Sequence, residues 1–456
     1  MSDVSVLFLA LPCSFSEQLF VSHMPRIFRK LLSAAQVILV VISLPLPVSA
    51  ATGAAPAPPV SRYWKGNLHT HTLWSDGDDF PEMVADWYKN HGYQFLALSD
   101  HNLIQYGQKW MDVASLQAKE ETLTRYIARF GVEGVEQRVV GHRTQVRLST
   151  LGEVQTRLQD AGRFLLIPAS ELTSNYKIWP VHINASNLRS ALAPVTGISV
   201  LDTMQKTVDA VLYQRAATGQ PMMPHVNHPN FGWAITAEDL AEVRGEKFFE
   251  VYNGHPETHS RGDGTRVSVE QIWDVVLAIR LSRQPPFPIY GLATDDAHRY
   301  HRYAENESNP GRGWVMVRSP RLEAADLINA MERGDFYAST GVELLDVRRD
   351  RRSLTVRVKP DRDTTFTIRF VGTPKNYNRS SEPIIAKDGR PYATTRRYSP
   401  EVGMMFREDH GLSATYTFEG HELYVRAVVI SSKKKESGSS PQEMEQAWTQ
   451  PLVWLP

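Results

Sequence analysis

The sequence predicts an α/β fold over residues 63–340 and an all-β region after it. Two observations predict this division. Up to about Tyr337, short apolar runs that end in polar residues alternate with amphipathic segments, as strands and helices do in α/β proteins. After about Gly341, apolar residues tend to recur at every second position, as in strands with one buried face. The alternation of strands and helices favours either an α/β barrel or an open doubly wound sheet.

Four apolar runs are predicted to form strands that are buried on both faces. They are FLALS before Asp100, FLLIPA before Ser170, FFEVYN up to Asn253 and PIYGLAT before Asp295. Continuous apolar runs of this length are typical of parallel strands that are covered by helices on both sides. Because the chain leaves these runs through polar residues, we expect polar side chains to gather at the carboxyl ends of the strands.

Helices are predicted between the strands. Apolar residues recur at positions i, i+3, i+4 and i+7 over residues 80–88, and similar spacings hold over 201–212 and 269–276. This spacing places the apolar side chains on one face of a helix. Gly92 and Gly219 follow the first two segments, where a glycine is expected to end a helix.

Two further regions depart from this alternation. Residues 106–162 are polar and helix-prone, and we interpret them as an insertion over the mouth of the predicted barrel. Residues 341–456 hold the runs SLTVRVK, TFTIRFVG and ELYVRAVVI, with Asp, Gly and Pro between them. These runs predict a separate, small, sandwich-like β-domain. The Lys433–Lys435 run is interpreted as a solvated loop.

Residues 1–50 are interpreted as a leader that holds a signal peptide over 24–50. Basic residues precede an apolar run from Leu31 to Leu44, which is too short for a membrane-spanning helix of about 20 residues. Small residues up to Ala50 supply a cleavage site, so we expect a secreted or periplasmic protein. The Ala/Pro-rich stretch that follows predicts a flexible linker over 51–62.

Composition limits the kinds of site that the chain can hold. The 456 residues include 50 Lys+Arg, 50 Asp+Glu and one Cys, which is Cys13 in the leader. The even charge balance gives no basis for nucleic-acid binding, and we expect no stable membrane span once the leader is removed. One Cys excludes an intrachain disulfide and a Cys-rich zinc site. A metal site must therefore consist of His and carboxylate side chains.

Histidines and carboxylates recur at or just past the ends of the predicted strands. His69 and His71 alternate in the first strand, so both imidazoles can point to the same face. The chemistry of parallel barrels lies at the carboxyl ends of the strands, where these residues fall. We therefore predict a metal site. Its candidate ligands are His69, His71, Asp76, His101, Glu171, His182, His225, Asp296 and His298.

Two of these positions have neighbours that compete for the same role. We prefer Asp296 over Asp295 because only Asp296 gives the DxH spacing with His298. We prefer His225 over His228 because His225 directly follows an apolar strand.

The order HTH, SDG, SDHN, SELT, HIN, HVNHP and TDDAH resembles the PHP family, which is named for polymerase and histidinol phosphatase. The likeness covers about 280 residues. Within the family, the chain resembles the branch that carries a C-terminal β-domain, and the WTQP motif near its end resembles that domain more loosely. The resemblance implies a distorted seven-stranded (β/α)7 TIM-like barrel with a cluster of two or three divalent metal ions.

The resemblance also implies a division of the ligands among three metals. Glu171 bridges the first two metals, and Asp76 stands where some family members have His, which leaves the identity of the second metal open. In this division the first metal takes His69, His71, Glu171 and Asp296, the second takes Asp76 and His101 with Glu171, and the third takes His182, His225 and His298.

Catalytic and substrate-binding roles are assigned to residues near these ligands. Asp76, Glu171 and Asp296 are catalytic as carboxylate ligands, and Asp100 is assigned as the partner that orients His101. The candidates for holding substrate or water are Asn102, Asn227, Asn253 and Arg299, although the first two asparagines are equally typical of turns.

Imidazole and carboxylate ligands together suit Zn²⁺, Mn²⁺ or Fe²⁺. Adjacent ions of this kind generate a bridging hydroxide and attract a phosphate. We therefore predict an exported metal-dependent phosphoesterase that hydrolyses a small phosphate ester. The alternative is a hydrolase of a non-phosphate ester, amide or carbamate, because the same hydroxide can attack a carbonyl carbon. A non-catalytic metal- or carbohydrate-binding protein and a proofreading nuclease are less favoured.

Overall fold

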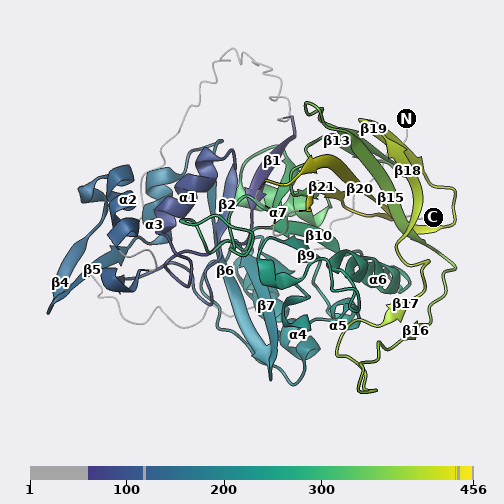
Figure 1. Ribbon diagram of the computed structural model, residues 1–456, viewed down its shortest axis with the longest axis horizontal. Helices are drawn as coiled ribbons and strands as arrows, with labels where there is room; N and C mark the ends of the chain where they lie inside the picture. The colour runs from purple at the N-terminus through teal and green to yellow at the C-terminus, as the bar shows by residue number, and fades with distance from the viewer. Residues whose placement is uncertain (1–59, 117–119, 437, 439–441, 454–456) are drawn as a thin grey trace, which may run out of the picture. The chain divides into compact units, whose positions relative to one another are not determined.

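Most strands of the chain belong to one long run of neighbouring strands (Figure 1). The computed structural model describes residues 60–116, 120–436, 438 and 442–453, and all of these lie within a single unit, Pro58–Pro456. The predicted leader 1–50, with Cys13, and most of the predicted linker lie outside the described residues.

The first part of the run has the order β10-β9-β8-β7-β6-β2-β1-β11-β12. Strands β1, β2 and β6 pair in parallel, as do β8, β9 and β10, whereas β7 is antiparallel to both of its neighbours. The chain is thus a mixed α/β structure with parallel strands. The bounds are β1 (Arg62–Asn67), β2 (Phe95–Leu98), β6 (Leu165–Tyr176), β7 (Trp179–Ser186), β8 (Met223–Val226), β9 (Phe248–Asn253), β10 (Tyr290–Thr294), β11 (Trp314–Ser319) and β12 (Phe336–Ser339).

The carboxyl ends of β1 and β10 meet although the two strands are far apart in the sequence. Thr70 and Ala297 form an isolated parallel bridge. Next to it, the His71 amide donates to the Ala297 carbonyl, and the Asp296 amide donates to the His69 carbonyl, both at 3.0 Å. The polar residues that follow these two strands are therefore held close together.

Helices cover these strands much as the apolar spacing predicts. Ser199 and Ser268 cap the starts of α4 and α6 by accepting backbone N–H bonds, and Gly219, at φ 67°, ends α4. The structure adds two helices, α5 and α7, for which no apolar spacing was identified. The bounds are α1 (Pro81–Asn90), α4 (Val200–Thr218), α5 (Ala237–Glu242), α6 (Val269–Leu281) and α7 (Ala324–Glu332).

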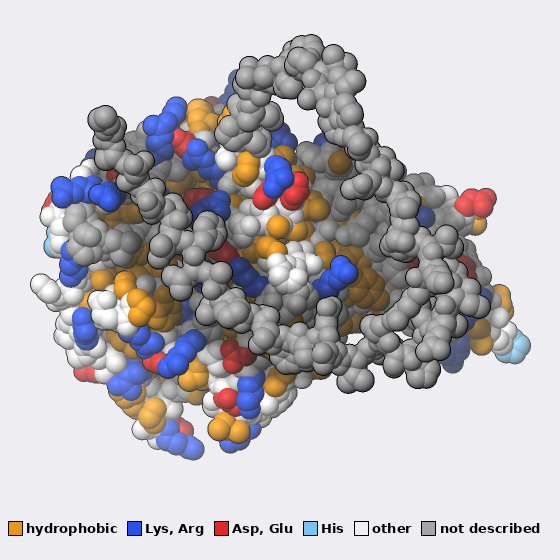
Figure 2. All heavy atoms as spheres, turned by 180° about the vertical axis from the view of Figure 1, so that it is seen from behind, with side chains coloured by type: hydrophobic (Ala, Val, Ile, Leu, Met, Phe, Trp, Pro, Cys, Tyr) orange, Lys and Arg blue, Asp and Glu red, His pale blue; other side chains and the backbone are white. Residues whose placement is uncertain are grey.

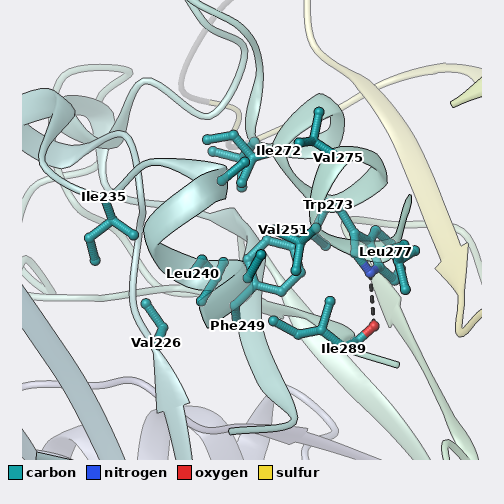
Figure 3. Packing of buried hydrophobic residues seen from close by; sticks show 14 of the residues in the cluster. Val226, Ile235, Leu240, Phe249, Val251, Ile272, Trp273, Val275, Leu277 and Ile289 are labelled. Atoms are coloured by element: carbon teal, nitrogen blue, oxygen red, sulfur yellow. Dashed lines mark hydrogen bonds between the residues drawn. The ribbon is translucent and has the colours of Figure 1, made fainter. Parts of the chain in front are cut away.

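Helix α6 shows how the core fixes a helix to a strand (Figure 3). Trp273 and Leu277 of α6 pack in one cluster with Phe249 and Val251 of β9, and all four side chains are buried. The Trp273 indole N–H also donates to the Ile289 carbonyl at 3.0 Å, so its one polar atom is satisfied.

The predicted insertion, 106–162, contains strands as well as helices. Its strands β3 (Lys109–Asp112), β5 (Arg143–Leu148) and β4 (Gln137–Val140) form a small antiparallel sheet beside α2 (Glu120–Phe130) and α3 (Leu151–Leu158). The sequence analysis missed this sheet because β4 is exposed along its whole length and carries no apolar alternation. Its core side chains pack on the loop after β1 through Leu73 and Trp74.

Beyond residue 341, the described residues form strands and no helix. Two sheets, β13-β14-β19 and the continuation β21-β20-β15-β18, share one apolar core. The second sheet joins β12 through the pairing of Ala338 with Trp448. The bounds are β13 (Leu344–Arg349), β14 (Ser353–Val358), β15 (Phe366–Pro374), β16 (Ser381–Glu382), β17 (Arg397–Tyr398), β18 (Met404–His410), β19 (Ser413–Thr417), β20 (Glu422–Lys434), β21 (Met444–Thr449) and β22 (Leu452–Val453).

The C-terminal strands contact the upstream strands closely. Helix α6 lies against β9 on one side and against β15 and β20 on the other (Figure 1). The side-chain amide of Gln450 both donates to and accepts from the buried backbone of Gly291 in β10, at 2.9 Å each way.

The surface is mixed in character. On the part of one face that Figure 2 shows uncovered, Lys and Arg side chains are scattered among apolar and acidic ones. In the described part of the chain, no helix is long and apolar enough to cross a membrane.

Candidate metal centre

The structure brings the predicted ligands together near the carboxyl ends of the parallel strands, with His182 contributed by the antiparallel strand β7. His69 and His71 follow β1, and His101 follows β2. Glu171, His182 and His225 lie within β6, β7 and β8, respectively. Asp296 and His298 follow β10. Most of the donors fall into three neighbouring groups, which we call the inner group, the mouth group and the third group, and a fourth potential group consists of His69, His225 and Glu250. The inner group is His69, His71, Glu171 and Asp296, the mouth group is Asp76, His101 and His298 beside His71, and the third group is Glu171, His182 and His228.

The inner group is a tight set of four buried donor atoms. The Nε2 atoms of His69 and His71 lie 3.1 Å apart. Asp296 Oδ1 lies 3.1 Å from the first and 3.2 Å from the second. Glu171 Oε2 lies 3.4 and 3.3 Å from the same two atoms.

These distances fit a divalent cation. Four ligands at the usual Zn²⁺ bond lengths form a tetrahedron with edges of about 3.3–3.4 Å. Moreover, buried Glu171 Oε2 makes no hydrogen bond of good geometry among the described residues, although His101 Nδ1 lies 2.9 Å from it. An ionised oxygen left so is costly unless a cation lies beside it. The inner group therefore has the composition and the spacing of a metal site.

The mouth group lies next to the inner group and reaches solvent. Asp76 Oδ1 lies 3.4 Å from His298 Nε2, and Asp76 Oδ2 lies 3.4 Å from His101 Nε2. The Asp76 side chain is 56% exposed, whereas the His71 side chain is fully buried. Because His298 Nδ1 lies 2.9 Å from the Asp296 carbonyl, to which it donates, the Nε2 lone pair of His298 faces Asp76. The centre is therefore open to solvent on this side.

The third group differs from the predicted one in two members. Glu171 Oε1 lies 3.0 Å from His182 Nδ1 and 3.5 Å from His228 Nε2, so His228, and not the preferred His225, shares this carboxylate oxygen. His298 belongs to the mouth group instead of the third group. Glu171 faces both the inner and the third groups, one oxygen toward each, which is the geometry of a bridging ligand.

His225 lies deeper in the protein than the third group. Its side chain is fully buried, and neither ring nitrogen has a hydrogen-bond partner among the described residues. Its nearest carboxylate oxygen is Glu250 Oε1, 3.5 Å from Nε2. His225 belongs instead to a further potential metal group, with His69 and Glu250.

In the described structure, the Asp100 carboxylate binds the loop that contains Thr72 and Ser75 instead of orienting His101. Its buried carboxylate accepts hydrogen bonds from the Thr72 amide and hydroxyl, from Ser75 Oγ and from Gln105 Nε2, at 2.6–2.8 Å. Ser75 Oγ in turn lies 3.4 Å from His71 Nδ1. Asp100 therefore acts on the centre through the loop beside His71.

Three of the predicted substrate residues are held within the protein. Asn227 Nδ2 donates to Glu171 Oε1 at 2.8 Å, and Asn253 Nδ2 donates to Asp296 Oδ2 at 3.1 Å, so both orient ligands. Asn102 Oδ1 accepts the Thr173 amide of β6 at 2.8 Å. Arg299 lies at the mouth, where its Nη1 donates to the Asp76 carbonyl at 3.2 Å.

Three residues at or beside the centre have a strained backbone. Asp296 has φ 50°, His228 has φ 20° and Asn102 has φ 57°, all in the left-handed region. Such conformations cost about 1–3 kcal/mol each and persist where surrounding contacts enforce them. The turns at Asp296 and His228 aim their side chains back at the donors.

At the centre, protons and metal cations compete for the same imidazole and carboxylate atoms. Burial lowers the pKa of His69, but Asp296, Glu250 and Glu171 hold it well above its ordinary value. Burial raises the pKa of Glu171, but His69, His101 and His182 hold it well below its ordinary value. The carboxylates are therefore ionised, and a bound cation replaces the protons that they attract to the imidazoles.

Glu250 is the main site residue that the sequence analysis missed. It lies in the apolar run FFEVYN of β9, is buried, and its Oε1 lies 2.7 Å from His69 Nδ1. A lone acidic residue inside a buried strand was the available signal, because burying a carboxylate needs dedicated partners.

Comparison with known proteins gives structural likenesses alone. No family model matches the chain, and no curated protein matches it. It is similar to a two-domain protein from Bacteroides vulgatus that contains a predicted PHP-like metal-dependent phosphoesterase, with 14% identity over 86% of this chain and 95% of that one and a TM-score of 0.39.

Two further solved structures are similar over part of the chain. One is a protein from Bifidobacterium adolescentis described as a metal-dependent phosphoesterase, with 12% identity over 59% of this chain and 94% of that one and a TM-score of 0.28. The other is an amidohydrolase from Chromobacterium violaceum with bound sulfate and no metal, with 14% identity over 52% and 88% and a TM-score of 0.27. The first two of these three neighbours are thus described as metal-dependent phosphoesterases, one of them within a two-domain protein.

Proposed function

We propose that this protein is a PHP-type metal-dependent phosphoesterase that hydrolyses a small phosphate ester. The observation that carries the proposal is the inner group, in which Glu171 Oε2 and Asp296 Oδ1 each lie 3.1–3.4 Å from the Nε2 atoms of both His69 and His71. Glu171 then extends this group to a second set of donors through its other oxygen.

Two or three divalent ions, Zn²⁺, Mn²⁺ or Fe²⁺, suit these imidazole and carboxylate donors. When bound, such ions supply a nucleophilic hydroxide from water and neutralise the charge of a phosphate. His69, His71 and Glu171, with Asp296 beside the two histidines, would hold the first ion, and His182 and His228 with Glu171 would hold another. Asp76, His101 and His298 form the remaining set.

The residues at the mouth account for a phosphorylated substrate. Asp76 is the exposed member of the centre, so the substrate meets the mouth group first. Arg299 lies beside it and is about one-third exposed, and its guanidinium suits a phosphate oxygen. The buried asparagines Asn227 and Asn253 hold ligand carboxylates in place and leave substrate binding to the mouth.

The proposal has a direct test. The purified protein is treated with a chelator, reloaded with Mn²⁺ or Zn²⁺, and assayed with p-nitrophenyl phosphate and p-nitrophenyl acetate. Metal-dependent release from the phosphate ester is expected. Metal-dependent turnover of the acetate alone would instead support the alternative hydrolase of carboxyl esters, amides or carbamates, and turnover that ignores the chelator would contradict both.

A pair of variants shows whether turnover arises at this centre. Asp76→Asn removes the exposed carboxylate of the mouth group, and Glu257→Gln removes an exposed carboxylate from the loop after β9. The first variant is expected to lose phosphatase activity and the second to keep it. Equal activities in the two variants would place the reaction elsewhere.

Three structural parts of the proposal go further than the strand order. The run β10 to β1, whose ends meet at Thr70 and Ala297, would form a distorted barrel. Residues 341–456 would form a separate β-domain, which limited proteolysis tests. The leader 1–50 would direct export with cleavage after Ala50, which N-terminal sequencing of the protein from its native host tests.

A further inference from the structure

Glu250 is a buried carboxylate directly behind the inner group. It lies in the middle of β9, between β8 and β10, and it is 1% exposed. None of the predicted ligand roles includes it. Its position raises the question of whether it binds metal or holds the residues that do.

The distances separate these two roles. Glu250 Oε1 lies 2.7 Å from His69 Nδ1, which is a hydrogen-bond length. Two ligands of one tetrahedral ion lie about 3.3–3.4 Å apart, as the atoms of the inner group do. In addition, His69 turns its other nitrogen, Nε2, toward His71, Glu171 and Asp296. The Glu250 contact is therefore made by the side of the imidazole that faces away from the inner group.

Glu250 also contacts other parts of the centre. Its Oε1 accepts a hydrogen bond from Thr294 Oγ1 at 2.8 Å. Its Oε2 accepts hydrogen bonds from the His228 amide and from Asn253 Nδ2, each at 2.8 Å. Asn253 donates in turn to Asp296 Oδ2. Glu250 thus contacts His69 and His228 directly and Asp296 through Asn253. All three of these residues carry candidate donor atoms.

We propose that Glu250 is the positioning residue of the metal centre, which fixes His69 with Nδ1 protonated and Nε2 free and which anchors the strained turn at His228. This inference rests on the proposed metal-dependent function and deepens it. A carboxylate behind a ligating imidazole sets the tautomer and the orientation of the ring, and it increases the basicity of the ligating nitrogen.

His71 provides an internal contrast. Its Nδ1 lies 3.4 Å from the neutral Ser75 hydroxyl and 3.6 Å from Asp76 Oδ1, and both contacts are longer than the one between His69 and Glu250. Charged partners form hydrogen bonds roughly twice as strong as neutral ones. Ser75→Ala is therefore expected to weaken metal binding less than a change at Glu250.

Glu250→Gln is a sharp probe because it conserves shape. The carboxylate receives four donors on two oxygens, whereas a glutamine amide offers one oxygen. Two of the donors must then face an NH₂ group. The matched control is Glu246→Gln, which makes the same change at a buried carboxylate just before β9, away from the metal centre.

The experiment measures metal binding and the state of the histidine rings. The purified full chain and both variants are stripped with a chelator, and the dissociation constants for Zn²⁺ and Mn²⁺ are measured by competition with a chromophoric chelator. Glu250→Gln is expected to weaken binding by about 10–100-fold, and Glu246→Gln to leave it unchanged. Nitrogen-15 spectra of the Zn²⁺-loaded proteins report the tautomers, and the Nδ1–H signal of His69 should shift in Glu250→Gln alone.

The outcomes separate this inference from the proposed function. Wild-type metal affinity and an unchanged His69 signal in Glu250→Gln would overturn the positioning role even if the wild-type protein hydrolyses phosphate esters. Weakened binding in Glu250→Gln supports it even if the wild-type protein hydrolyses no phosphate ester, because affinity is measured without substrate. Equal losses in Glu250→Gln and Glu246→Gln would also overturn it, since any buried carboxylate would then have the same effect.

Discussion

Two regions of the molecule bury charge in opposite ways. At the contact between α6 and β20, Arg426 donates to both oxygens of Asp274, at 2.9 and 2.6 Å, and Tyr424 donates to the same carboxylate. At the metal centre, Glu171 Oε2 makes no hydrogen bond of good geometry in the described structure, and two imidazole nitrogens face each other at 3.1 Å.

The difference separates structural charge from functional charge. The first cluster is complete as it stands, because each charged group has an opposite charge and hydrogen bonds that compensate for burial. The second is costly in the absence of a cation, and strained residues such as Asp296 and His228 hold it in place. Burial alone does not identify a site, whereas several imidazoles and carboxylates with closely spaced donor atoms do.

The largest effect is expected from Glu171→Gln. This change removes the carboxylate that both the inner and the third groups share, so the metals lose their bridging ligand. A loss of about 4 kcal/mol in transition-state stabilisation corresponds to roughly a 10³-fold loss in kcat/KM. Steady-state assays with metal analysis check this. Activity within tenfold of wild type would show that Glu171 is not the shared ligand.

Arg426→Met tests the other region. The variant leaves the Asp274 carboxylate buried without its partner, and we expect the free energy of unfolding to fall by about 3–5 kcal/mol. Metal affinity at a temperature where the variant is folded should be unchanged. Urea unfolding measures the first quantity. The double variant Arg426→Met, Asp274→Leu should recover part of the loss, and no recovery would argue against a charge-burial cost.

The competing histidines offer a smaller and sharper test. His228→Gln should weaken binding of the most weakly held metal by about 10–100-fold, since it removes a nitrogen that faces Glu171. His225→Gln should have less effect, because His225 faces Glu250 instead. Metal content of the two purified variants after dialysis makes the comparison, and a greater loss in His225→Gln would reverse the assignment.

The smallest effect concerns a carboxyl group far from either cluster. Burial raises the pKa of Glu246 to about 8. A carboxyl with a raised pKa stabilises the fold below its unfolded pKa of about 4.3, and this contribution is lost as pH rises through 8. Glu246→Gln should remove about 1–3 kcal/mol of this pH dependence. Urea unfolding at pH 5 and pH 8 measures it, with exposed Glu242→Gln as the control that should behave as wild type.

Much of the architecture could be predicted because periodicity reports burial. The helices over 81–90, 200–218 and 269–281 follow the apolar spacing, and the polar residues after β1, β2 and β10 converge as expected. The sheet of the insertion could not be predicted, because β4 is exposed and lacks apolar alternation.

The details of the centre depend on contacts that spacing does not encode. His228 faces Glu171 because the chain turns through a left-handed conformation there, which a sequence pattern does not show. Glu250 resembled a residue of the core because its neighbours in β9 are apolar. Asp100 adjoins His101 in the sequence but binds the loop at Thr72 and Ser75 in space.

The Gln450 side chain makes with Gly291 the two backbone hydrogen bonds that a neighbouring strand would make. Its amide offers both the acceptor and the donor that an adjacent strand would offer, so it covers one position on the edge of β10. Without it, two buried backbone groups would lack these partners, at a cost of about 1–3 kcal/mol each. The edge of the strand that leads to Asp296 is therefore covered by a residue about 150 positions later in the sequence. The position of this candidate ligand thus depends on the C-terminal region.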